Sequence, residues 1–339
     1  MPKEIIKKTP EAKELHKIIL EIYDIFKKIC EKEGYRYFAI SGTTIGAGFW
    51  KGIIPWDDDM DIAMPIEDYE KFTKKYRSEK LLPEHIRFIE YSWFGCKLHD
   101  DRTTFTNLHY ITDTKRYNGV FIDIVPIFAL PEDEVSRNKI ITSLHKYTKN
   151  ALLMDRYGFY DDVKDDAELK ELKDFILHSY RFGETPYVMD FSDPRYILDS
   201  KGFENPIDMP FENTTTPVSS NWKNDLKIQY KNFQKYPPKE VHQSSHQLLG
   251  VLDFKKGYES YEKEFHELPE WITNIVKGQH IFEGQSVLST YRHNDNVNKL
   301  NQELFDLQSK YDSLLRAYNE PYPKKLLKKI RNHFIKQKP

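Results

Sequence analysis

The spacing of apolar and polar residues predicts helices that alternate with short strands in the first half of the chain. Between residues 11 and 32, apolar side chains recur three and four positions apart, which is typical of an amphipathic helix, and Gly34 marks its end. Short apolar runs that read as strands occupy residues 35–40, 59–64 and 119–125. Further helices are expected over residues 43–50, 66–80 and 131–157. This order predicts an α/β fold in which a mixed sheet is flanked by helices.

The pattern is less regular in the remainder of the first 250 residues. Residues 86–98 and 103–111 have strand character, and residues 160–186 are charged and mostly helical. Residues 187–240 are rich in Pro, Asn, Ser and Thr, so we expect loops there, with one helix near 221–235.

The last part of the chain changes character. Seven apolar residues between 297 and 318 follow the three- and four-residue steps of a coiled coil, which fits either a homo-oligomer or packing on the protein's own body. Residues 324–336 combine basic residues with helical apolar spacing, a pattern typical of a helix that lies on an anionic membrane surface. The predicted divisions are a main domain over 1–250, a helical extension over 251–320 and a basic amphipathic tail over 321–339.

Composition limits the classes of function. Two cysteines, Cys30 and Cys96, provide neither a disulfide framework nor a cysteine-based zinc site, so a cytoplasmic location is expected. The sequence has no run of 18 uncharged apolar residues and no apolar signal segment near residue 1. The net charge is −2, but residues 324–339 hold seven Lys and Arg and no acid, which leaves −9 for the remainder. An acidic body argues against a nucleic-acid partner.

The strongest chemical signal is a group of acids that leads into an apolar strand. Asp57, Asp58, Asp59 and Asp61 fall within five positions, and carboxylates this close repel one another unless a cation neutralises them. Strand geometry sends Asp59 and Asp61 to one face and Met60 to the other. Two carboxylates on one face suit Mg²⁺, with Mn²⁺ as a substitute. The alternative is a solvated turn or a set of acids that cap a helix.

Two further features support chemistry on phosphate. The small-residue turn of Ser41, Gly42 and Thr43 offers backbone N–H groups and a hydroxyl to phosphate oxygens, although it also reads as a plain tight turn. Asp123 interrupts the apolar strand 119–125, where an unpaired carboxylate would carry a large desolvation penalty. We therefore expect Asp123 to bind a cation or accept a proton, the alternative being a structural acid with satisfied hydrogen bonds.

These motifs also carry a resemblance to a known family. The segment 41–64, SGTTIGAGFWKGIIPWDDDMDIAM, resembles the signature of the LicD/fukutin phosphotransferases, and GVFIDIVP at 119–126 looks like the second acidic strand of that family. A looser similarity covers 209–212, the prolines at 237–238 and His246. Members usually carry an Arg shortly after the Gly-Ala pair, where this chain has Phe49 and Trp50.

The resemblance implies a nucleotidyltransferase (polymerase-beta-like) fold and transfer of a phospho-alcohol. The implied donor is a CDP-alcohol, most often CDP-choline, and the implied acceptor is a sugar hydroxyl of a cell-surface glycan or its lipid-linked precursor, with CMP as the second product. The implied catalytic and metal-binding residues are Asp59, Asp61 and Asp123. The candidates for contacts with substrate or nucleotide are Ser41, Gly42, Thr43, Lys51, Trp56, Asp58 and His246.

Two other interpretations remain open at this point. A nucleotidyltransferase of the same fold would attack the other phosphorus and release pyrophosphate. A catalytically inactive glycan-binding or scaffold protein would keep the fold, but such a protein has no reason to retain carboxylates that repel one another. Lys51 and Trp56 are equally compatible with packing in the core. If the acceptor is lipid-linked, the basic tail places the protein at the inner face of the cell membrane.

Overall fold

The computed structural model describes residues 8–78, 81–92, 95–106, 119–144, 167–190, 196–230, 233–234 and 251–261. All of them belong to the first of two compact units, residues 1–290. The predicted coiled coil at 297–318, the basic tail and His246 lie outside the described residues, and the domain boundaries stay predictions. Within the described ranges, no helix is both long enough and apolar enough to cross a bilayer.

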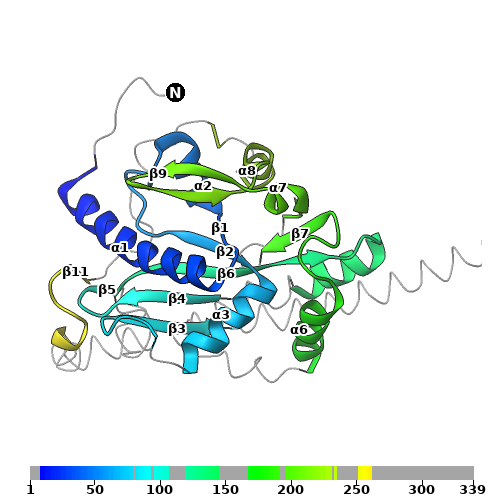
Figure 1. Ribbon diagram of the computed structural model, residues 1–339, viewed down its shortest axis with the longest axis horizontal. Helices are drawn as coiled ribbons and strands as arrows, with labels where there is room; N and C mark the ends of the chain where they lie inside the picture. Colours follow the sequence, from blue (N-terminus) through cyan, green and yellow to red (C-terminus); the bar gives the residue numbers. More distant parts are fainter. Residues whose placement is uncertain are drawn as a thin grey trace, which may run out of the picture. The chain divides into compact units, whose positions relative to one another are not determined.

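A mixed sheet forms the centre of the described unit (Figure 1). Its main path runs in the order β1-β2-β6-β4-β3, and β7 and β8 extend it beside the second half of β6. Strands β2 and β6 are parallel, and the other pairs in this sheet are antiparallel. The strands are β1 (Phe38–Ala39), β2 (Asp61–Pro65), β3 (Ile86–Ser92), β4 (Gly95–Asp100), β6 (Val120–Leu130), β7 (Tyr187–Asp190) and β8 (Leu198–Asp199).

Two helices, α1 (Pro10–Glu33) and α3 (Ile66–Ser78), lie across one face of this sheet (Figure 1). The Thr9 side chain caps the first turn of α1, and Gly34 ends the helix in the left-handed region with φ of 70°. The apolar stripe of α1 packs on the sheet, with Ile19, Ile22 and Phe26 fully buried. The predicted amphipathic helix and the mixed sheet flanked by helices are therefore confirmed.

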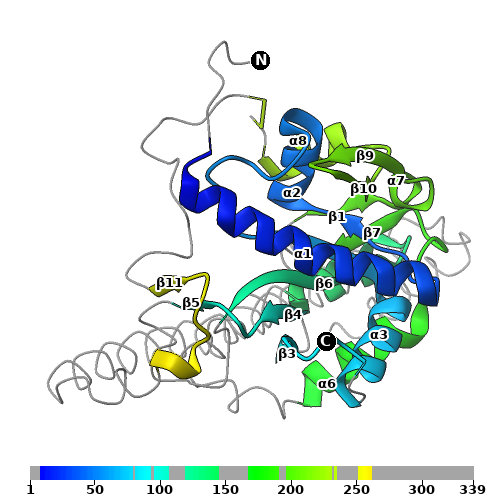
Figure 2. The same cartoon turned by 60° about the vertical axis from the view of Figure 1, so that its left-hand side comes forward.

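A group of short elements lies close to the start of β2. Helix α2 (Ser41–Ile45) continues into a π-helical turn (Gly46–Trp50), and the hairpin of β9 (Ile207–Phe211) and β10 (Thr214–Val218) lies beside them with α8 (Trp222–Tyr230). Figure 2 shows this group at one end of the unit, with β11 (Val251–Asp253) paired to β5 (Thr104–Thr106) away from it. Helix α6 (Ala167–Ser179), helix α7 (Ser200–Glu204) and a helical stretch at 134–144 complete the described elements.

Strand β6 continues five residues beyond the end expected from the sequence, through Pro126. Asp123 donates its N–H to the Met60 carbonyl on the β2 side at 2.8 Å, so the N–H positions of residues 122, 124 and 126 face the opposite edge. On that edge, pairing with β4 ends at Ile124 and pairing with β7 begins at Ile127. Pro126, which has no N–H, lies between these two pairings, so the sheet loses no hydrogen bond there.

The expectation of loops over residues 187–240 is wrong, although its helix near 221–235 is confirmed by α8. The segment contains four short strands and α7. Pro210 and Pro217 lie within the β9–β10 hairpin, opposite Thr215 and Asp208. Each strand of a two-stranded ribbon has one edge without a partner, and such an edge tolerates proline. The composition concealed the hairpin for that reason.

Candidate metal and phosphate site

Three carboxylates meet at the start of the two parallel strands. Asp61 and Asp123 are direct neighbours in the β2–β6 register, so their side chains project from the same face of the sheet. Asp59 lies two residues ahead of β2, and Met60 between them is fully buried on the other side, as the alternation predicts. One oxygen from each of Asp59, Asp61 and Asp123 lies within 4.8 Å of the others. We call these three residues the carboxylate triad.

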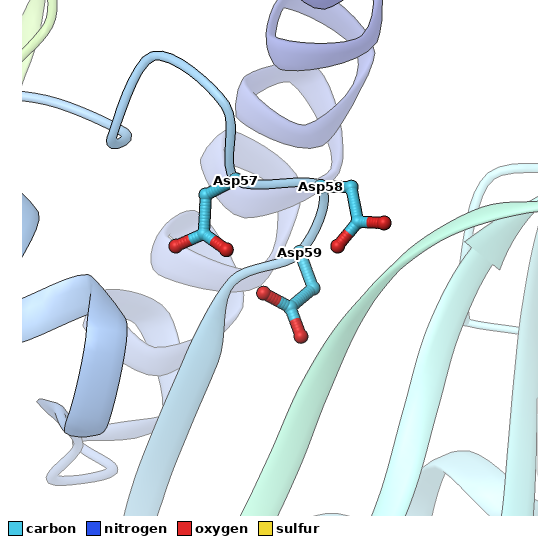
Figure 3. Close-up of side chains that lie close together, drawn as sticks. All are labelled: Asp57, Asp58 and Asp59. Carbon is cyan, nitrogen blue, oxygen red and sulfur yellow. The ribbon is translucent and has the colours of Figure 1, made fainter. Parts of the chain in front are cut away.

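Asp59 also belongs to a second group, with Asp57 and Asp58, whose carboxylate oxygens satisfy the same 4.8 Å spacing. Figure 3 shows the three side chains projecting from one side of the loop that enters β2. Asp58 is 1% exposed. A Cβ placed on Gly42 would lie 3.1 Å from Oδ2 of Asp57, so the Gly42 turn adjoins this loop. The acidic loop and the candidate phosphate turn therefore form one surface.

The electrostatics of the triad favour a cation. Burial raises the pKa of Asp61 well above its ordinary value, and Asp59, Asp123 and Asp57 raise it further. The ionised form of Asp61 is therefore disfavoured in the folded protein without a cation. A divalent cation would stabilise that form, and a donor set made only of carboxylate oxygens suits Mg²⁺ or Mn²⁺.

Lys97 supplies the positive charge that the chain itself places beside the triad. It is the register neighbour of Asp123 on β4, and its Nζ lies 2.8 Å from Oδ2 of Asp123. The same Nζ lies 3.4 Å from the centroid of the Phe121 ring. Both members of the ion pair are largely buried, at 13% and 14% exposure, and Lys97 acts against the rise in the pKa of Asp61. Lys97 thus engages one carboxylate oxygen of Asp123, Oδ2.

Thr43 connects the candidate phosphate turn to the triad. Its hydroxyl accepts a hydrogen bond from the Asp61 N–H at 2.8 Å, and the residue is buried. The neighbouring Thr44 hydroxyl donates to the Ala39 carbonyl at 2.8 Å. Ser41 opens α2 with φ of 50°, a left-handed conformation that is uncommon for a residue with a side chain. The turn thus fixes the start of β2, which is a role the sequence did not reveal.

Helix α1 supports the acidic loop through a buried histidine. Nε2 of His16 lies 2.7 Å from the Asp57 carbonyl, and burial lowers the pKa of His16 to about 4. The imidazole is therefore neutral at pH 7 and donates its Nε2–H to that carbonyl. This contact ties the backbone of the loop to α1.

Lys51 and Glu212 form a second support for the segment that leads into the acidic loop. Both residues have left-handed backbone, with φ of 54° and 53°, and the Glu212 N–H donates to the Lys51 carbonyl at 2.6 Å. The Glu212 carboxylate accepts from the Ile53 N–H at 3.2 Å and pairs with Lys8. A Cβ on Gly52 would lie 2.3 Å from Glu212 Oε1, so only glycine allows this approach. The segment 209–212, which resembles a substrate-side element, thus anchors the loop ahead of the acids.

Aromatic rings surround the π-helical turn. Trp56 packs edge-to-face on Trp50 with centroids 5.7 Å apart, and Phe49 packs in the same way on Trp222 at 5.8 Å. A Cβ on Gly48 would lie 2.6 Å from the Trp222 ring, which explains why a glycine faces that indole. Phe49 and Trp50 thus give this turn aromatic side chains packed on neighbouring rings.

The structure brings together most of the residues that the sequence singled out. Those it brings together are Ser41, Gly42, Thr43, Asp58, Asp59, Asp61 and Asp123. Lys51 instead contacts Glu212, and Trp56 contacts Trp50. The roles of all these candidates toward a metal or substrate stay predictions, as does that of His246. Sequence reasoning missed His16 and Lys97, and it singled out Glu212 only as part of the segment 209–212. The alternation of strand 95–100 offered a signal for Lys97, a charged residue between two apolar neighbours.

Replacing Thr43 with valine is expected to reduce turnover about 100-fold, because Asp61 loses the acceptor that fixes its backbone position. The unfolding free energy should fall by about 1–3 kcal/mol, the cost of a buried N–H without a partner. Thr44→Val is the matched control, since it removes a similar buried hydrogen bond to Ala39. It should cost comparable stability and keep turnover. Equal turnover in both variants would contradict the role of Thr43. Unfolding in denaturant and steady-state rates measure the two effects.

Comparison with known proteins shows what these features are similar to. Residues 34–162 match the family model described as LicD/FKTN/FKRP, nucleotidyltransferase domain, and this range contains the whole triad. The chain is 26% identical over 261 residues to the lipopolysaccharide cholinephosphotransferase LicD of Haemophilus influenzae. The match covers 68% of this chain and 93% of that protein. The resemblance to the LicD/fukutin family inferred from the motifs is thereby confirmed.

Proposed function

We propose that the chain is a divalent-metal-dependent transferase with a nucleotidyltransferase-type fold. It moves phosphocholine from CDP-choline to a sugar hydroxyl of a cell-surface glycan, or of its lipid-linked precursor, and releases CMP. The observation that carries the proposal is the triad of Asp59, Asp61 and Asp123 on one sheet face, a set of like charges that a divalent cation would neutralise. The name of the Haemophilus relative supports the choice of phosphocholine and of a lipopolysaccharide acceptor.

In this proposal each residue of the site has a separate role. Asp59 and Asp61 would hold the cation, which would supply positive charge beside the phosphates of the donor. Ser41 and Gly42 offer backbone N–H groups to the phosphate oxygens, and Thr43 holds Asp61 in place. Lys51, Trp56 and Asp58 lie on the loop that faces the nucleotide.

The reaction is a single displacement at the phosphorus that carries choline. The sugar oxygen forms a new bond to that phosphorus, the bond to the bridging oxygen breaks, and CMP leaves in line. The hydroxyl proton goes to a carboxylate, and Asp123 is the candidate, since Lys97 binds one of its two oxygens, Oδ2. The alternative role of Asp123 is third ligand to the cation, and the two roles are separated experimentally in the Discussion.

The test is to incubate full-length protein with Mg²⁺, O-deacylated lipopolysaccharide and one CDP-alcohol at a time, namely CDP-choline, CDP-ethanolamine, CDP-glycerol or CDP-ribitol. CMP should appear with CDP-choline and disappear when EDTA is added, and the glycan should gain a phosphodiester signal in ³¹P NMR. Pyrophosphate from CTP and phosphocholine, without CMP from any CDP-alcohol, would identify a nucleotidyltransferase instead. Neither product would indicate an inactive protein of the same fold.

A lipid-linked acceptor would explain the basic tail. Residues 324–338 carry seven Lys and Arg, and each basic residue near an anionic leaflet contributes about 1 kcal/mol of binding. We expect full-length protein to float with anionic liposomes at low salt, and binding to weaken as salt is added. A chain truncated after Tyr322 should stay with the unbound fraction. On this proposal the tail holds the enzyme at the cytoplasmic face of the membrane. Equal flotation of both forms would contradict that role of the tail.

A further inference from the structure

A cavity of about 740 Å³ lies at the end of the sheet formed by the start of β3 and the end of β4. Arg87 and His99 line it from the strands, Asp101 lines it from the turn after β4, and residues 257–260 line it from the segment after β11. Nothing in the family match or in the sequence motifs assigns a function to this cavity, which we call the β3–β4 pocket.

Two residues that line the β3–β4 pocket, Arg87 and His99, project from the sheet face that carries the triad. Between β6 and β4, Asp123 lies opposite Lys97. Two residues further along, His99 on β4 lies between Phe121 on β6 and Arg87 on β3. Residues two apart on a strand share a face, so His99 and Arg87 project from the same side as Asp123. From the spacing of strands and residues, the His99 and Asp123 Cα atoms are about 8 Å apart.

The pocket and the candidate phosphate turn lie on opposite sides of the triad. Across the sheet, the order is β1, β2, β6, β4 and β3, and α2 leads from β1 to β2 while the pocket lies at β4 and β3. In-line displacement requires that the attacking hydroxyl and the leaving group approach the phosphorus from opposite sides. If the donor diphosphate lies at the α2 side, as the proposed function has it, the acceptor approaches from the pocket side.

The charges of the pocket suit a neutral polyhydroxyl ligand. Its described lining carries two guanidinium groups, Arg87 and Arg102, against three carboxylates, Asp101, Glu84 and Glu259. Arg87 donates to Asp101, and Arg102 is paired with Asp100 outside the lining. This balance disfavours a polyphosphate. Carboxylate acceptors beside guanidinium donors match the hydroxyl groups of a sugar, each of which donates and accepts.

One buried polar atom in the pocket has no hydrogen-bond partner among the described residues. His99 is 5% exposed, its Nδ1 makes no hydrogen bond, and Asp101 Oδ1 lies 3.4 Å from it. Burial lowers the pKa of His99 to about 4, so the ring is neutral at pH 7 and offers an acceptor or a donor. Buried polar atoms are normally satisfied, and a ligand hydroxyl would satisfy this one.

Hydrogen bonds and close packing hold the segment that forms the wall of the pocket, residues 251–260. The Thr104 hydroxyl donates to the Lys256 carbonyl at 2.8 Å, and β11 pairs with β5. A Cβ on Gly257 would lie 2.1 Å from the Asp101 carbonyl oxygen, so glycine is needed where the wall crosses the end of β4. The residues that line the cavity are thus fixed relative to the sheet that carries the triad.

We propose that the β3–β4 pocket is the acceptor subsite and holds a sugar ring of the glycan through Arg87, Asp101 and His99. The proposal rests on the proposed function for the identity of the reaction, but glycan binding itself can be measured without turnover. Binding of full-length protein to a printed array of mono- and oligosaccharides of hexoses, hexosamines and their N-acetyl forms provides that measurement.

Arg87→Met and Asp101→Asn should each lower array binding at least about tenfold, a loss of one charge-assisted hydrogen bond. Arg77→Met is the matched control, because Arg77 pairs with Glu90 at 2.7 Å outside the pocket lining, and it should bind like wild type. Asp61→Asn should also keep glycan binding while it loses CMP release. Circular dichroism melting confirms that each variant is folded.

The outcomes separate the two proposals. Wild-type protein that binds no sugar, or pocket variants that bind as well as wild type, would overturn the acceptor subsite. Weakened binding in Arg87→Met with intact binding in Arg77→Met and Asp61→Asn supports it. If wild-type protein binds glycan through the pocket but releases no CMP from any CDP-alcohol, the glycan site stands and the proposed transfer fails.

Discussion

Asp61→Asn is expected to lower the rate of CMP release by about 10³-fold, since a bound cation supplies several kcal/mol of transition-state stabilisation and each 1.36 kcal/mol is tenfold in rate. The variant should fold. The pKa of Asp61 is raised by burial and by three neighbouring acids, so its ionised form destabilises the metal-free protein above the pKa of an unfolded aspartate. Removing that charge should leave metal-free stability at pH 7 equal or higher.

Asp24→Asn is the control for Asp61→Asn, because Asp24 pairs with Lys28 on the exposed side of α1, away from the triad. It should keep the wild-type rate. Addition of MgCl₂ should raise the melting temperature of wild type and of Asp24→Asn but not of Asp61→Asn, since only a protein that binds the cation is stabilised by it. A rate for Asp61→Asn above about a tenth of wild type would contradict the metal assignment.

Asp123→Asn is expected to lower kcat by about 10²–10⁴-fold, the range for loss of a general base, while the Kd for CDP-choline stays within a few-fold. The amide keeps the shape of the side chain beside Lys97 but cannot accept the proton. Single-turnover rates and equilibrium binding of CDP-choline measure the two quantities separately.

The metal dependence of Asp123→Asn distinguishes its two roles. A variant that needs much more Mg²⁺ and recovers its rate at high Mg²⁺ has lost a ligand, whereas one that stays slow at saturating Mg²⁺ has lost the proton acceptor. If Asp123→Asn instead binds CDP-choline far more weakly and turns over normally at saturation, Asp123 is a binding residue and neither role holds.

The carboxylate triad could be predicted from the sequence because its members sit in strongly patterned segments. The alternation around Met60 fixed which face Asp59 and Asp61 share, and the apolar neighbours of Asp123 required a compensated charge. The mixed sheet followed from helices and strands of regular period. Each of these inferences depends on local spacing alone.

The supports of the site could not be predicted because they join distant segments. His16 on α1 reaches the Asp57 carbonyl, and Glu212 reaches Ile53 from the hairpin tip. Lys97 meets Asp123 only through the antiparallel register of β4 and β6, which no periodicity reveals. The composition of the β9–β10 region was misleading for a different reason, since prolines that are excluded from central strands are tolerated in a two-stranded ribbon.

The central claim is that Asp59, Asp61 and Asp123 bind a divalent cation, and titration of full-length protein with Mn²⁺ tests it most directly. Free Mn²⁺ gives a six-line signal in electron paramagnetic resonance that vanishes on binding. We predict that wild type removes this signal, and more strongly with CDP-choline present. Asp61→Asn should bind Mn²⁺ at least about tenfold more weakly, because even the loss of an outer-shell partner typically lowers metal affinity by about 10–100-fold. Equal binding of Mn²⁺ by wild type and Asp61→Asn would contradict the account.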